Sequence, residues 1–191
     1  MFEAKAGQSS KGSWVWNDLH AADVLLSRPL QDCLGSAPLA AEQLPPFVLV
    51  LPERLKEQMI EHAGRWITHE QAGILLGRAY RDPGGIVYTV LTAAVPVDDT
   101  EAGIAQVKLR ASSWPSIWKE LLQDQEQEIV GWYHSHPGYG IYMSATDQNT
   151  QNNYFSAQWQ IAVIVDPVRR EFGVFAGNNT DPLPDSAVLC I

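Results

Sequence analysis

Hydrophobic positions between residues 47 and 177 follow two distinct periods. Short apolar runs bounded by Gly, Pro, Asp or Asn are typical of buried β-strands. Other segments place apolar residues three or four positions apart, which is the spacing of one face of an α-helix. The pattern predicts strands at 47–51, 72–80, 86–97, 106–111, 128–136, 158–167 and 171–177, and helices at 52–64, 112–125 and 144–155. Strands and helices in this order predict an α/β (α+β) fold, with a mixed sheet flanked by two or three helices.

The first 45 residues have a different pattern. The segment SWVWNDLHAADVLL places Trp14 and Trp16 on one face of a short predicted strand, followed by a helical turn. A connector rich in Pro, Ala and Gly follows it. We interpret residues 1–45 as an N-terminal arm, which the two tryptophans pin to the core, and residues 46–191 as one domain.

Composition narrows the classes of partner. The chain has 191 residues, of which 46% are hydrophobic and 18% charged, as in an ordinary globular protein. A formal net charge of −9 argues against nucleic acid and anionic membrane surfaces, and it is compatible with a neutral or basic protein partner. The apolar run at 161–165 is far too short to span a bilayer.

Two further features of the sequence bear on the cellular compartment of the protein. The N-terminus has no apolar stretch typical of a secretory signal. Cys33 and Cys190 lie far apart and form no CxxC pair, so neither a disulfide framework nor a cysteine-based zinc site is expected. These features predict a cytoplasmic protein.

The stretch GWYHSHPGYGIYMSATD, residues 131–147, holds two histidines, a serine and an aspartate. Side chains two residues apart on a strand point to the same face, so His134 and His136 are expected to project side by side. The turn-rich PGYGIYM connection can bring the next helix start back over the strand end. Asp147 would then supply a third ligand and water a fourth, which is the pattern of catalytic zinc sites.

Each half of this pattern also has a purely structural explanation. Ser144 followed by Asp147 is the spacing of a helix N-cap with an acid at the third helical position. Two histidines on a partly exposed strand face need no function. The complete spacing H-x-H-P-x6-S-x-x-D is more specific than either half, because the same residues can cap the helix and bind an ion without conflict.

Other zinc motifs are incomplete in this sequence. HEQAG begins like H-E-x-x-H, but Gly73 stands where the second histidine would be. The nucleic-acid deaminases require P-C-x-x-C, which is absent.

Five residues together resemble a known family. Glu70 in HEQAGILLG, His134 and His136 in GWYHSHPGYG, and Ser144 and Asp147 in SATDQNTQ look like the motif of the JAMM (MPN-plus, JAB-domain) metalloproteases. That family includes the proteasome-lid deubiquitinase and its prokaryotic relatives. The likeness extends over about 47–176 and implies the MPN/JAB1 fold, which is similar to that of the cytidine deaminases.

The resemblance also implies a mechanism. It implies a single Zn²⁺ per chain, with His134, His136 and Asp147 as ligands and a zinc-activated water as nucleophile. Glu70 would act as general acid/base, and Ser144 would help to polarise the scissile carbonyl. The implied activity is isopeptide or peptide cleavage after the C-terminal tail of ubiquitin or a ubiquitin-like protein.

Three hypotheses about function therefore remain. The first is this deubiquitinase-like isopeptidase, the second a non-catalytic MPN scaffold subunit, and the third a zinc hydrolase acting on small amide or peptide substrates. For the first, VDDTEAGIAQVKLRASS is our candidate edge for adding an extended substrate tail as a strand. The resemblance to prokaryotic members further implies E1- or E2-like conjugation enzymes as possible partners and, for some bacterial relatives, antiviral defence.

Overall fold

The computed structural model describes residues 25–35, 44–97 and 114–191. The helices are α1 (Gln31–Leu34), α2 (Glu53–Gly64), α3 (Trp114–Leu121), α4 (Ala145–Tyr154) and a short 3₁₀-helix, η4 (Asp185–Ala187). The strands are β1 (Leu26–Ser27), β2 (Phe47–Leu51), β3 (Ala72–Arg81), β4 (Val87–Val97), β5 (Glu128–Ser135), β6 (Ile161–Asp166), β7 (Glu171–Ala176) and β8 (Val188–Cys190).

These strands form one mixed sheet in the order β7-β6-β5-β3-β4-β2-β8, and β1 pairs with β3 outside that path. β3 pairs antiparallel with both β4 and β5. β5 and β6 are parallel, so the chain must return along the sheet between them, and α4 lies in this crossover. The predicted mixed α/β architecture is confirmed.

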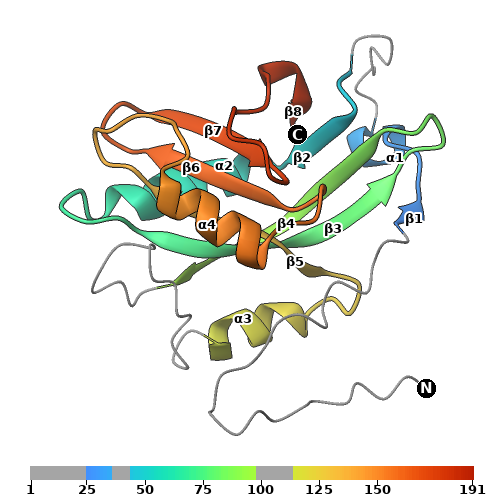
Figure 1. Cartoon of the computed structure of the whole chain (residues 1–191). Coiled ribbons are helices and arrows are strands. Elements are labelled where there is room, and N and C mark those ends of the chain that lie inside the picture. The colour runs from blue at the N-terminus through green and yellow to red at the C-terminus, as the bar shows by residue number, and fades with distance from the viewer. Residues whose placement is uncertain (1–24, 36–43, 98–113) are drawn as a thin grey trace, which may run out of the picture.

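Helices cover both faces of the sheet, with α4 in front of it and α2 behind it in Figure 1. Leu55 and Met59 of α2 pack in a buried cluster that includes Tyr133 of β5. Ile117 of α3 packs in a second cluster that includes Trp132. Because Trp132 and Tyr133 are neighbours on one strand, their side chains point to opposite faces. β5 therefore lies between two hydrophobic layers and contributes to both.

The predicted elements agree closely with the structure where both exist. The hairpin, the buried strands and the three longer helices all lie within a few residues of their expected ranges. Trp14, Trp16 and the predicted strand at 106–111 lie outside the described residues. No described helix is both long enough and apolar enough to cross a membrane.

Both ends of the described chain carry structure that the pattern did not predict. β1 pairs with the end of β3, and Leu30 is completely buried in a third cluster between β2 and β4 residues. β8 pairs in parallel with β2. β1 and β8 are only two and three residues long, too short to show a hydrophobic period. Their pairing with strands distant in the sequence stabilises them.

Candidate metal centre

Three side chains from two elements converge at the end of β5. His134 is the penultimate residue of that strand and His136 lies one residue beyond it, while Asp147 belongs to the first turn of α4. The two Nε2 atoms of the histidines are 3.0 Å apart. The Asp147 carboxylate lies 3.3 Å from Nε2 of His134 and 3.5 Å from Nε2 of His136. All three side chains are buried. These are the residues that the sequence predicted to share an ion.

The spacing of these donor atoms fits a metal ion. Donors about 2.1 Å from a tetrahedrally coordinated ion lie about 3.4 Å from one another. The two histidine nitrogens are slightly closer than this, and each has one Asp147 oxygen near that distance, Oδ1 for His134 and Oδ2 for His136. Two neutral imidazole nitrogens and a carboxylate otherwise bring lone pairs together in a buried space, which is unfavourable without a proton or a cation between them. The arrangement is therefore compatible with a metal site.

The electrostatics of the cluster also favour a cation. Burial alone would raise the pKa of Asp147, but hydrogen bonds from His134, His136 and Ser144 outweigh it and hold that pKa well below its usual range. Burial alone would lower the pKa of His136, but Asp147 and, more weakly, Glu70 reverse this and raise it. The carboxylate is thus ionised, and positive charge beside it is stabilised.

Strand register explains why Glu70 reaches the same place. Ala72, the first residue of β3, pairs with His134 on the antiparallel β5. The residues just before β3 therefore lie beside those just after β5, and the backbone N–H of Ser135 extends the ladder by donating to the carbonyl of Gln71 at 2.9 Å. Oε1 of Glu70 lies 4.0 Å from Nε2 of His136, and its side chain is 33% exposed. Glu70 borders the three donors and remains accessible to solvent.

Ser144 is the N-cap of α4 in a complete capping box. Its Oγ accepts a hydrogen bond from the backbone N–H of Asp147, and its own backbone N–H donates to the Asp147 carboxylate at 2.8 Å. This confirms the predicted cap. The capping bond uses a lone pair of Oγ and leaves the hydroxyl proton available to another acceptor.

Asp166, at the end of β6, braces the turn that follows His136, and the sequence did not single it out. Its fully buried carboxylate accepts hydrogen bonds from the backbone N–H groups of Gly138 and Gly140 at 2.9 and 2.8 Å. It also accepts bonds from the N–H groups of Val168 and Arg169 in its own turn. The two glycines have φ of 80° and 83°, a conformation that favours glycine. The Asp-Pro pair that closes a buried strand is the signal that would have identified this turn.

Comparison with known proteins places this site in a family context. A family model described as prokaryotic homologs of the JAB domain matches residues 52–173. COP9 signalosome complex subunit 5 of Caenorhabditis elegans is 34% identical over 116 residues, which is 59% of this chain and 30% of that protein. Ubiquitin carboxyl-terminal hydrolase RPN11 of Saccharomyces cerevisiae is 30% identical over 118 residues, which is 59% of this chain and 36% of that protein. The chain therefore matches about a third of each relative's length.

A solved structure supports the fold independently. The solution structure of a protein from Desulfitobacterium hafniense superposes with a TM-score of 0.52 at 16% sequence identity. The match covers 75% of this chain and 93% of that one. At this identity the likeness concerns the fold alone.

We expect the protein to bind one divalent metal ion per chain through His134, His136 and Asp147. Elemental analysis of protein purified without added metal, together with titration of the metal-free form, measures the stoichiometry. His136→Ala removes one donor and is expected to abolish this binding. A wild-type protein that takes up no ion on titration would refute the site.

We expect Asp166→Asn to destabilise the fold by about 2 kcal/mol, because the amide NH2 group that replaces one carboxylate oxygen cannot accept a hydrogen bond. In the wild type, Oδ1 accepts from the N–H groups of Gly138, Val168 and Arg169, and Oδ2 accepts from that of Gly140. Those bonds hold the pKa of Asp166 below its usual value although burial opposes them. A depressed pKa contributes stability that is present above the unfolded-state pKa and is lost as the pH falls through the folded-state pKa. Urea unfolding between pH 7 and pH 3 should show the wild-type advantage shrinking towards acid. A constant difference across that range would contradict this assignment.

Proposed function

The chain belongs to the family of prokaryotic homologs of the JAB domain, and from the geometry of its site we propose that it is a zinc-dependent isopeptidase or peptidase. Its proposed substrate is the bond that follows the C-terminal tail of ubiquitin or a ubiquitin-like protein, either an isopeptide bond or a peptide bond in a precursor. The observation that carries the proposal is the convergence of two histidines and an aspartate, with an accessible glutamate 4.0 Å from one of them.

The donor set favours zinc among the metals available to proteins. Two imidazoles and one carboxylate are common zinc ligands, and three protein ligands leave one position open, as in catalytic zinc sites. When bound, zinc supplies Lewis acidity towards the carbonyl and lowers the pKa of water at the open position. His134, His136 and Asp147 would hold the ion.

Glu70 is suited to move the proton. A carboxylate at the edge of the donor cluster can take a proton from the attacking water on one oxygen and deliver it to the departing amine nitrogen. Its partial exposure gives water and a substrate access to it, whereas the three donors behind it are buried. The three buried side chains would thus bind the metal ion, and the accessible Glu70 would transfer the proton.

Ser144 is suited to donate to the oxygen of the scissile carbonyl. Its Oγ is fixed by the cap bond from Asp147, so the hydroxyl proton is presented at the start of α4 beside a proposed ligand. A fixed donor of this kind stabilises the negative charge that develops on the oxygen during attack.

Exposed apolar side chains around the site favour a protein substrate over a small amide. The ring of Tyr142, 49% exposed, lies 4.9 Å from that of His136. Trp66, 58% exposed, stacks on His69 immediately before Glu70. Large exposed aromatic side chains are typical of surfaces that bind other proteins. The candidate edge for an extended substrate tail, 97–113, lies outside the described residues except for Val97.

The presence of all three proposed ligands together with Glu70 and Ser144 favours an enzyme over a non-catalytic scaffold. A scaffold requires the fold but gains nothing from a buried carboxylate beside two histidines, which is costly to maintain. Among the relatives, the Saccharomyces cerevisiae protein is named as a ubiquitin hydrolase and the Caenorhabditis elegans protein as a subunit of the COP9 signalosome.

We expect Glu70→Gln to retain zinc and to lose turnover, because it removes the proton acceptor without removing a ligand. Zinc content and cleavage of a linear ubiquitin-like fusion are measured on the same preparation. Glu61→Gln is the matched control, since Glu61 is an exposed acid on α2 whose Oε1 is 3.7 Å from Arg65. Near wild-type turnover in Glu70→Gln would refute the acid/base role.

We expect Ser144→Ala to lower the cleavage rate by about two to three orders of magnitude. Loss of the cap should also cost roughly 1 kcal/mol of stability, whereas Ser144→Gly should cost only a few tenths. Melting temperature, zinc content and single-turnover cleavage separate the two effects: both variants should be equally slow, and only the alanine variant clearly less stable. Lowered stability with unchanged cleavage would restrict Ser144 to its capping role.

A further inference from the structure

No protein group in the described residues accepts a hydrogen bond from the second ring nitrogen of His134. A metal-binding histidine usually donates its other ring N–H to a carboxylate, a carbonyl or water, which holds the ring in place. Nδ1 of His134 is buried, and among the described residues it has no hydrogen-bond partner. Among protein contacts, packing therefore holds this ring towards His136 and Asp147.

Trp132 provides that contact. Its indole is two residues before His134 on β5 and stacks on the imidazole, with ring centroids 4.5 Å apart and an angle of 8° between the planes. Both side chains are almost fully buried, and the ring of Phe155 also stacks on the indole, with centroids 6.2 Å apart and an angle of 18° between the planes. The buried imidazole of His134, packed against the indole, has little freedom to rotate about χ1 or χ2. The plane of His134 consequently follows the plane of Trp132.

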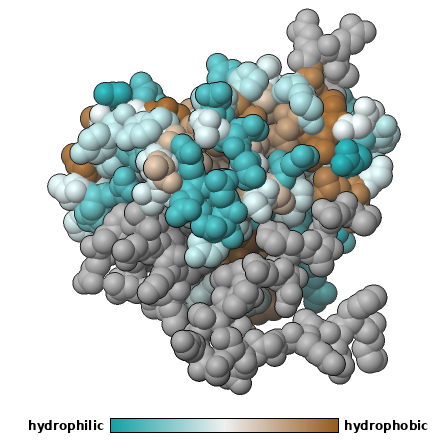
Figure 2. Space-filling model, viewed as in Figure 1, coloured by the Kyte–Doolittle hydropathy of each residue, from teal (hydrophilic) through white to brown (hydrophobic). Residues whose placement is uncertain are grey.

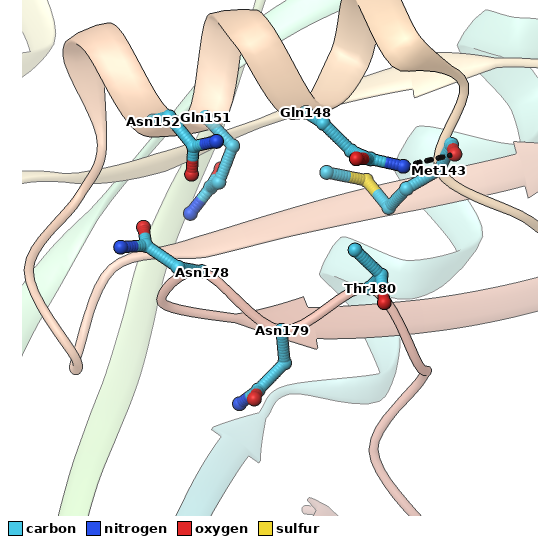
Figure 3. A pocket seen from close by; sticks show the side chains of 7 residues that line it. All are labelled: Met143, Gln148, Gln151, Asn152, Asn178, Asn179 and Thr180. Atoms are coloured by element: carbon cyan, nitrogen blue, oxygen red, sulfur yellow. Dashed lines mark hydrogen bonds between the residues drawn. The ribbon is translucent and has the colours of Figure 1, made fainter.

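Gln151 of α4 fixes the indole in turn. Its Oε1 accepts a hydrogen bond from Nε1 of Trp132 at 2.8 Å, and its Nε2 donates to the carbonyl of Phe155 at 2.8 Å. Gln151 is 1% exposed. Figure 3 shows it reaching inward from α4 at the edge of a small polar hollow. That hollow has a volume of about 20 Å³, room for about one water molecule, and none of the three proposed ligands lines it.

α4 depends on this hydrogen bond more than an ordinary helix would. Its buried residues are Asp147, Thr150 and Gln151, so it has no apolar stripe facing the core. Its outward face is also hydrophilic, as the teal surface over α4 in Figure 2 shows. Polar contacts must therefore fix its position against the sheet. Gln151 lies one turn after Asp147, so the bond to Trp132 ties the helix that carries one ligand to the strand that carries another.

We propose that Gln151 and Trp132 are positioning residues for the metal centre: Gln151 holds the indole, and the indole holds the imidazole of His134 in the orientation that binds the ion. The inference rests on the metal site of the proposed function, but not on any particular substrate. It assigns to a tryptophan stack the task that a hydrogen bond to the second ring nitrogen performs in other sites.

The test is the affinity of the full chain for Zn²⁺, measured by competition with a chromophoric chelator, and the visible absorption spectrum of the Co²⁺-loaded protein. Gln151→Met, which keeps the length of the side chain but removes its polar atoms, should weaken zinc binding by about tenfold or more and alter the cobalt spectrum. Trp132→Phe keeps an aromatic face but removes the N–H, and it should weaken binding similarly. It also decides the question if Gln151→Met fails to fold.

Thr89→Val is the matched control. Thr89 is fully buried on β4, and its Oγ1 donates a hydrogen bond to the carbonyl of Trp159 at 2.7 Å, away from the metal centre. It should lower the melting temperature while leaving zinc affinity within twofold of wild type. In the Trp132→Phe background, Gln151→Met should cause no further loss of affinity, because both changes break the same bond.

The outcomes separate this inference from the proposed function. If wild-type protein binds no zinc, the metal site itself is refuted and the positioning role with it. If wild type binds zinc and the Gln151 and Trp132 variants bind it equally well with an unchanged cobalt spectrum, the positioning role alone is refuted. Additive losses in the double variant would also overturn it, since Gln151 would then act through a contact other than Trp132.

Discussion

Burial of the Asp147 carboxylate beside two imidazoles is the constraint on which the rest of the site depends. An unpaired carboxylate in a protein interior costs on the order of several kcal/mol, so the fold must compensate it. The compensation comes from the backbone N–H of Ser144, the N-terminus of α4 and the two histidines. Each of these partners requires α4 to begin where β5 ends. The parallel crossover between β5 and β6 provides that placement, because the chain leaves β5 at its carboxyl end, begins α4 there, and only afterwards returns to the amino end of β6.

The same constraint accounts for the unusual character of α4. A helix that buries Asp147, Thr150 and Gln151 cannot be stabilised by transfer of apolar surface from water. Its N-terminus is fixed by the capping box, and its middle by the bond between Gln151 and Trp132. Asp166 performs a corresponding task for the turn after His136. Hydrogen bonds from buried polar groups, which are directional, thus hold the segments that carry the ligands, whereas the sheet beneath them is held by ordinary hydrophobic packing.

The sequence was informative wherever a local period or spacing determined the outcome. Alternation along a strand placed His134 and His136 on one side, and the capping spacing placed Asp147 at a helix start. Glu70 is different, because its position depends on the register between β3 and β5, and only the resemblance to a family identified it. Gln151 and Trp132 carried no local signal at all. A glutamine in a helix and a tryptophan in a strand are ordinary residues until the packing of two elements brings them together.

The hydroxyl of Ser144 can cap α4 and donate a hydrogen bond to a substrate at the same time. A hydroxyl has two acceptor lone pairs and one proton. In Ser144 the cap bond from Asp147 occupies the acceptor side, so the conformation that stabilises the helix leaves the proton for an incoming carbonyl. Two reciprocal bonds couple the residues: the backbone N–H of Asp147 donates to Oγ of Ser144, and the backbone N–H of Ser144 donates to the Asp147 carboxylate. A helix start built in this way presents a ligand and a hydrogen-bond donor at a constant separation, which a flexible loop cannot do. The sequence pattern S-x-x-D therefore has a physical reason to stand at a metal centre as well as at a helix cap.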